Sequence, residues 1–228
     1  MAETHSLRLP ERRRPRRTQV ERRAETRARI LAATIESINE IGYQRTTSAE
    51  ITRRSGVTWG AVQHHFGGKD GILGAIVEDS FNDFSAGLAE AFESLPRKTS
   101  LPRRIGTFVD AAWEHFGSAR YRASFEILLA DSVSREARAE PERNDLSWQN
   151  EILKAWTRIW HRLFPELDLG RRRTLMIQHY TISTLSGLAS LQLLAGKPPP
   201  FLRDELELLK KTLAREFRGA GSGNGKED

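Results

Sequence analysis

Apolar residues recur every three or four positions along most of the chain, and this spacing restricts its regular structure to helices. In the first run Ile30, Leu31, Ile38 and Ile41 share one helical face, and Gly42 ends the run. No segment alternates apolar and polar residues between hairpin turns, which is the pattern expected of strands. We therefore predict an all-α fold.

Glycine and proline divide this pattern into separate helices. The first is expected to begin at Val20, and two short helices follow at 48–55 and 58–66. Longer helices are expected at 69–94, 101–118, 121–139, 146–164, 170–195 and 202–218. The predicted organisation is a disordered basic arm over 1–19, a three-helix domain over 20–67, a helical bundle over 68–218 and a flexible tail over 219–228.

The amino-acid composition excludes several classes of function. The chain has 228 residues and no cysteine, which excludes disulfides, thiolate metal sites and thiol catalysis. It lacks the apolar runs of a signal peptide or a membrane span, so we expect a cytoplasmic protein without a membrane partner. Residues 1–30 hold ten arginines and four glutamates, which accounts for the whole net charge of +6. Such a block suits a polyanion partner, and it equally suits a solvated leader.

The stretch GVTWGAVQHHFGGKDGIL, residues 56–73, allows three chemistries. A phosphate loop requires G-x-x-x-x-G-K-[ST], but Gln63 stands at the first glycine position and Asp70 follows the lysine. A metal site requires converging ligands, but His64 and His65 point about 100° apart on a helix. No H-E-x-x-H motif or nucleophile turn is present either. We therefore expect no metal, no cofactor and no enzymatic activity.

DNA recognition, the third chemistry, fits the helix that Thr58 can cap. Its outward face carries Trp59, Gly60, Gln63 and His64. Its inward face carries Ala61, Val62, His65 and Phe66. An outward glycine costs about 1 kcal/mol relative to alanine, a cost that close approach to another surface explains. The preceding helix ends at Gly56, which is helix-turn-helix spacing, although a surface helix with an unusual tryptophan is the alternative.

Over residues 24–77 the chain resembles the TetR family of bacterial transcription regulators. The resemblance rests on ILAATIESINEIGYQRTT and on SAEITRRSGVTWGAVQHHFGGKDGIL. The family usually has a tyrosine that touches the DNA backbone where this chain has Gln63. By motif position the resemblance implies DNA contacts from Thr46, Thr47, Thr58, Trp59, Gly60, Gln63, His64 and Lys69. Arg53 and Arg54 lie near a helix end, where phosphates are commonly bound.

The resemblance also implies a homodimer on a roughly palindromic, double-stranded operator. An N-terminal helix-turn-helix DNA-binding domain would precede a C-terminal helical bundle for ligand binding and dimerisation. Two recognition helices would enter major grooves about 34–36 Å apart, or a multiple of that distance. Helices 170–195 and 202–218 would form the dimer interface. The arm over 8–23 would either contact DNA or remain a solvated tail.

Aromatic residues gather in the C-terminal half, which contains four of the five tryptophans. Each alone is ordinarily a packing residue, but together they suit a pocket for an apolar or aromatic small molecule. The residues expected at this pocket are Trp113, Phe116, Tyr121, Phe125, Trp156, Trp160, His179 and Tyr180.

The sequence thus predicts a TetR-like regulator, in the first place a repressor that a small-molecule effector releases from its operator. The effector would favour a conformation whose recognition helices are wrongly spaced, and helix 69–94 would connect the two parts. A helical carrier or enzyme with a basic leader is the alternative from another class. A chromosome organiser that binds DNA without selection is a third.

Overall fold

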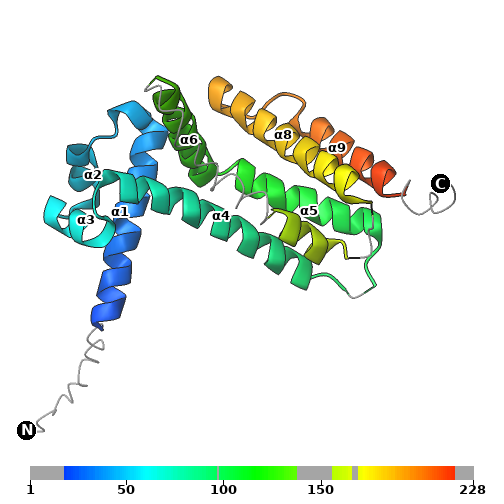
Figure 1. The fold of residues 1–228 in the computed structure, drawn as a ribbon, viewed down its shortest axis with the longest axis horizontal. Coiled ribbons are helices and arrows are strands. Elements are labelled where there is room, and N and C mark those ends of the chain that lie inside the picture. Colours follow the sequence, from blue (N-terminus) through cyan, green and yellow to red (C-terminus); the bar gives the residue numbers. More distant parts are fainter. Residues whose placement is uncertain (1–17, 97, 138–155, 166–168, 219–228) are drawn as a thin grey trace, which may run out of the picture.

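The computed structural model describes residues 18–96, 98–137, 156–165 and 169–218 (Figure 1). All regular structure in these ranges is helical, so the predicted all-α class is confirmed. Residues 1–17 of the predicted basic arm, the predicted tail over 219–228 and residues 138–155 lie outside the described ranges.

Local sequence signals account for the N-terminal elements. α1 (Gln19–Ile41) begins at a capping box in which Thr18 and Glu21 bond each other's backbone N–H groups. A 3₁₀ turn, η1 (Tyr43–Arg45), leads to α2 (Ser48–Ser55) and α3 (Trp59–Phe66). The predicted ranges 48–55 and 58–66 are therefore confirmed, with Thr58 just outside its helix as the N-cap.

The remaining elements form the larger part of the molecule. They are α4 (Lys69–Glu93), α5 (Leu101–Phe116), α6 (Ala119–Ala137), a helical stretch over 156–163, α8 (Arg171–Ala195) and α9 (Leu202–Arg218). α6 begins two residues earlier than predicted, because the Ser118 hydroxyl accepts the Tyr121 backbone N–H at 3.0 Å and so caps its first turn. α5 lies centrally and packs against α4, α6, α8 and α9.

Two hydrophobic cores result. The first includes Ile30, Ile38, Ile51 and Val62 of α1–α3, with Ile72 and Ile76 of α4 and Ala123 and Ile127 of α6. Because α4 and α6 contribute to it, this core crosses the domain boundary expected between residues 67 and 68. α4 then runs from the first core into the second, where Phe84 and Leu88 are buried (Figure 1).

The second core lies among α4, α5, 156–163, α8 and α9. It buries the α9 stripe of Leu206, Leu209, Leu213 and Phe217. These side chains fill the core of their own chain, so the predicted dimer contact of this helix would use another of its faces, and that contact stays a prediction. No helix in the described ranges has the length and apolar character needed to cross a bilayer.

Candidate DNA interface and ligand pocket

Side-chain and glycine caps define the ends of α3. The Thr58 hydroxyl accepts the Ala61 backbone N–H at 3.3 Å, and Gly67 ends the helix in the left-handed conformation at φ 73°. Between α2 and α3, Gly56 turns the chain at φ 63°. These signals are local, which is why the sequence predicted both ends of the helix.

Arginines fix α2 against α1. The Arg29 guanidinium donates to the Ser55 carbonyl at 2.6 Å and so satisfies the C-terminal end of α2. Arg54 forms ion pairs with Glu40 at 2.6 Å and with Glu50 at 2.5 Å. Hydrogen bonds from Arg53 and Arg54 lower the pKa of Glu50 to about 2. The Glu50 carboxylate is therefore ionised at neutral pH and paired with Arg53 and Arg54.

The exposed face of α3 follows the predicted pattern. Gly60, Gln63 and His64 are exposed, whereas Val62 is fully buried in the first core. Trp59 is only half-buried and packs against that core, so part of its side chain remains exposed. A polar helical face with a glycine at its centre is therefore open to a second molecule.

Two glycines in this region have different reasons to be there. A Cβ at Gly71 would lie 1.8 Å from the Phe66 carbonyl oxygen, so glycine is sterically required where α4 passes the end of α3. A Cβ at Gly60 would meet only the Thr58 hydroxyl, at 3.9 Å. In the part of the chain that the structure describes, no atom excludes a larger side chain at Gly60, so this glycine is not required by packing there.

Polar groups flank the exposed face. Thr47 and Thr58 are exposed N-cap residues at the starts of α2 and α3. Lys69 begins α4, and its Nζ lies 5.0 Å from the centre of the Tyr43 ring, a cation–π contact that orients the ammonium group. Helix N-termini and oriented cations are both groups that bind phosphates.

The predicted contact from Thr46 is not available. Its side chain is fully buried, where its hydroxyl donates to the Gly42 carbonyl at 3.0 Å and lies 2.9 Å from the Ser37 hydroxyl. Arg54 is also unsuited to phosphate binding, because its side chain is 13% exposed and engaged by glutamates. Arg53 is more exposed but is paired with Glu50 at 2.6 Å.

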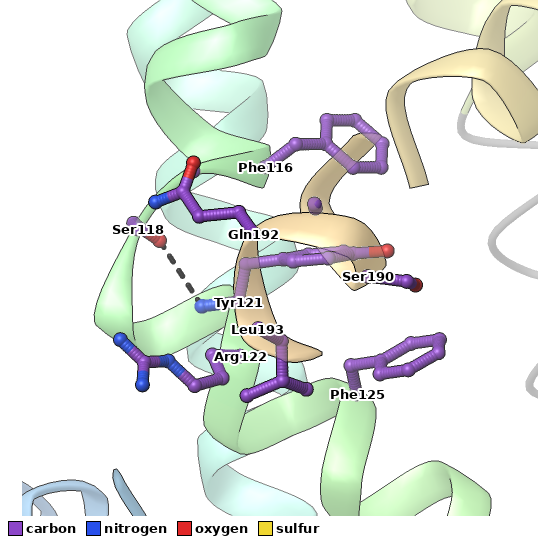
Figure 2. Close-up of a pocket in the computed structure, with 10 residues that line it drawn as sticks. Phe116, Ser118, Tyr121, Arg122, Phe125, Ser190, Gln192 and Leu193 are labelled. Carbon is purple, nitrogen blue, oxygen red and sulfur yellow. Dashed lines mark hydrogen bonds between the residues drawn. The ribbon is translucent and has the colours of Figure 1, made fainter. Parts of the chain in front are cut away.

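The predicted ligand residues do not form one site. Phe116, Tyr121 and Phe125 line a pocket between the α5–α6 junction and the end of α8, together with Ser190 and Gln192 (Figure 2). Its volume is about 20 Å³, which is room for about one water molecule. An organic effector therefore requires this part of the structure to open.

Two other predicted residues lie in the second core. Trp156 and Trp160 are 3% and 2% exposed, and both pack edge-on against Phe108. Trp113 lies partly buried at the margin of the same core. His115 packs 4.7 Å from the Phe84 ring, and burial, with a smaller effect of Arg120, lowers its pKa to about 4. His115 is therefore neutral at pH 7.

The remaining two predicted ligand residues, His179 and Tyr180, are exposed on α8, so the prediction that they line an interior pocket is wrong. Tyr180 belongs to an outward stripe of α8, and His179 lies beside it. The members of the stripe follow at three- and four-residue spacing and are Met176, Tyr180, Ser183, Gly187, Leu191 and Leu194. Leu194 is 84% exposed. We call these six residues the α8 stripe.

Sequence reasoning missed two features. The first is Gln178, a fully buried amide on the apolar side of α8. The second is a set of ion pairs in which Asp79 of α4 binds Arg27 of α1 at 3.0 Å and lies 4.0 Å from Arg120 of α6. Local spacing carries no signal for such long-range pairs. Among the described residues, no group of histidine, aspartate and glutamate is arranged to bind a metal.

Comparison with known sequences identifies the N-terminal region. Residues 30–76 match the family described as "Bacterial regulatory proteins, tetR family". The HTH-type transcriptional regulator BetI of Escherichia coli is 33% identical over 88 residues, which are 39% of this chain and 45% of BetI. The match thus spans less than half the length of that relative.

Solved structures resemble the chain over most of its length. A transcriptional regulator from Rhodococcus sp. Rha1 has a TM-score of 0.59 at 21% identity, covering 83% of this chain and 96% of that one. SmeT in complex with triclosan has a TM-score of 0.56 at 24% identity, covering 84% and 91%. At these identities the likeness establishes the shared fold.

Proposed function

We propose that this chain is a homodimeric, effector-responsive transcriptional repressor of the TetR family, because residues 30–76 match the bacterial regulatory proteins of that family. The outward face of α3 carries this proposal. It is capped at both ends, is fixed to a rigid core, and presents Gly60, Gln63 and His64 to solvent.

We assign two kinds of contact to this face. Gln63 and His64 are placed to bond base edges, and Gly60 lets the helix enter a major groove closely. Thr47, Thr58 and Lys69 surround that face and suit phosphate oxygens, which position the protein without reading sequence. The half-buried Trp59 would pack on sugar or on a thymine methyl group. These roles leave out Thr46, whose side chain is buried.

The α8 stripe supports a homodimer. Large apolar side chains such as Leu191 and Leu194 are exposed on it, and contiguous apolar surface of this kind marks an interface. Ser183 and Gly187 at its centre would let two copies of α8 approach closely. Such a dimer would present two α3 helices to a two-fold symmetric operator.

The aromatic core supports a small-molecule effector. SmeT, which shares the fold, is seen with triclosan bound. In this chain Trp156 lies 4.8 Å from Phe84 of α4, and the other end of α4 contributes Ile72 and Ile76 to the first core. A ligand that displaces Trp156 would therefore shift α4, and it would favour the conformation with altered α3 spacing.

α6 provides a second connection between the two parts. Its Glu126 carboxylate accepts the Tyr43 backbone N–H at 3.1 Å, and the Ala119 carbonyl accepts from Asn39 at 3.0 Å. Arg120 adds an ion pair with Asp83 at 3.1 Å. Because α6 binds α1 and η1 on one side and α5 on the other, movements of the bundle reach the DNA-binding region through α6 as well as α4.

Selection of genomic fragments tests the proposal. The full chain should enrich a short, roughly palindromic sequence, and Gln63→Ala should change the base preference at defined positions. Lys211→Ala, which replaces an exposed side chain of α9 outside the DNA-binding region, is the surface control and should leave the selected sequence unchanged. Binding without any enriched sequence would indicate a chromosome organiser, and absence of binding would indicate a carrier.

A further inference from the structure

The second core contains two buried nitrogen atoms that lack hydrogen-bond partners. They are Nε1 of Trp160, whose side chain is 2% exposed, and Nε2 of Gln178, which is fully buried. Most buried polar groups in native proteins are paired, and an unpaired donor costs the free energy of removing it from water. Two such donors in one core therefore require an explanation.

These two side chains belong to neighbouring parts of the core. The Thr157 hydroxyl donates to Oε1 of Gln178 at 3.3 Å, which places the Gln178 amide against the helical stretch 156–163. Thr157 and Trp160 are three positions apart and therefore lie on the same side of that helix. The Trp160 ring is surrounded by Phe108, Phe164 and Phe217 at centroid distances of 5.3–5.5 Å.

The side chains around Trp160 and Gln178 also determine whether a charged ligand group can bind between them. The core cluster around Trp160 and Ile177 consists of apolar and aromatic side chains. Among the described residues at its border, His115 is neutral at pH 7 because burial lowers its pKa, and the Arg104 guanidinium lies 5.2 Å from the centre of the Phe164 ring. No charged side chain belongs to the buried cluster itself, so a charged group placed among its members would lose its hydration without gaining a counter-ion there, and the molecule that enters must be uncharged in this part.

We infer that the effector is an uncharged, largely apolar or aromatic molecule with a carbonyl or ether oxygen, which accepts hydrogen bonds from Trp160 Nε1 and Gln178 Nε2. An indole nitrogen can only donate, so an acceptor is the group that completes it. The inference rests on the proposed function, because it names the chemical class of the effector. It assigns Gln178, absent from the predicted pocket residues, to ligand binding.

A pair of matched probes tests the acceptor requirement. Acetophenone carries a carbonyl oxygen where α-methylstyrene of the same shape carries a methylene group. The full chain should bind acetophenone at least about tenfold more tightly, by quenching of tryptophan fluorescence. One of the indole N–H signals in an ¹⁵N-labelled sample, the one absent from Trp160→Phe, should move downfield with acetophenone alone.

Variants on α8 separate ligand binding from packing. Gln178→Met removes the unpaired Nε2 donor while keeping the side-chain volume, so it should abolish the preference for acetophenone. It also removes the acceptor of the Thr157 hydroxyl, so its melting temperature should fall no further than that of Thr157→Val, which should keep the preference. Thr181→Val is the matched control, because Thr181 is equally buried but its hydroxyl already donates to the Ile177 carbonyl at 2.8 Å. It should keep the preference.

The outcomes separate the inference from the proposed function. Equal affinity of the wild type for both probes, including no binding of either, overturns the inference. The same holds if Gln178→Met keeps the preference, because the amide would then not donate to the probe. If acetophenone is preferred while no DNA sequence is selected, the binding site stands and the regulator does not.

Discussion

Thr46 provides a direct test of whether its role is structural or DNA-binding. The Thr46 hydroxyl donates to the Gly42 carbonyl, so the Ser37 hydroxyl donates to Thr46, and both side chains are fully buried. Thr46→Val keeps the shape but leaves the Ser37 hydroxyl and the Gly42 carbonyl each without this partner. A buried polar group without a hydrogen-bond partner lowers the free energy of unfolding by about 2 kcal/mol, within the usual range of roughly 1–3 kcal/mol.

The expected loss is measurable as a shift in melting temperature. For a chain of this size 1 kcal/mol corresponds to about 2–4 °C, so Thr46→Val should melt about 4–8 °C below the wild type at equal protein concentration. Ser37→Ala should also destabilise. The double variant should lose about 1–2 kcal/mol less than the sum of the single losses, because it removes donor and acceptor together.

DNA affinity distinguishes the two roles. Well below the transition, Thr46→Val should bind operator as tightly as the wild type in fluorescence anisotropy. Thr47→Val is the matched comparison, because Thr47 is exposed and should lose both its helix cap and a phosphate contact. An unchanged melting temperature together with a large loss of DNA affinity in Thr46→Val would refute the structural role.

Four further predictions concern the interface, the dimer and the interior. Lys69→Ala should weaken binding to all DNA sequences alike and make the slope of log affinity against log salt concentration about one unit shallower. Gln63→Ala should lose about 1–3 kcal/mol of binding free energy at particular base pairs only. Salt titrations of both variants on the selected operator and on a scrambled duplex measure these effects. Leu191→Glu should shift the chain to monomers in sedimentation velocity and abolish operator binding, while Lys197→Glu, an exposed position outside the α8 stripe, should remain dimeric. Arg120→Gln removes the α6 partner of Asp79 and Asp83. It should reduce the release of operator by an effector while the affinity for the effector stays the same. If operator release and effector affinity fell equally, Arg120 would not connect the bundle with the DNA-binding region. Burial lowers the pKa of His115 to about 4 in the folded state, from an ordinary value of 6.5. The neutral imidazole therefore contributes its full stability above pH 6.5, and that contribution, about 3 kcal/mol at most, is lost as the pH falls toward about 4. In urea unfolding, the free energy of unfolding of His115→Leu should depend less on pH over that range than that of the wild type.

The helix ends and the exposed face of α3 were determined by the sequence alone. Thr58, Gly56 and Gly67 act within a few residues of their own positions, so capping and turn geometry can be inferred without knowing the rest of the fold. The three-to-four-residue period likewise indicates which side of α3 is apolar, and Val62 is buried as expected. The predicted ranges 48–55 and 58–66 follow for the same reason, whereas most of the predicted helix 146–164 lies outside the described residues.

Only the tertiary structure decided what each apolar or polar face meets. Periodicity identified the leucine stripe of α9 as apolar, but an intramolecular core and a dimer interface have the same pattern, and packing placed the stripe in the core. Thr46 and Thr47 are adjacent threonines of similar intrinsic preference. One is buried against Ser37 and the other is exposed, because η1 turns the chain between α1 and α2.

For the charged and aromatic residues, too, the sequence indicated the residue types but only the fold decided their contacts. Composition gathered the aromatic residues into one group, but the fold divides them among a small pocket, a closed core and the surface. Asp79 joins Arg27, 52 positions away, and lies beside Arg120, so no local window contains the pair. A sequence specifies local conformation through neighbouring residues, whereas the partner of a side chain depends on which distant elements the whole fold brings beside it.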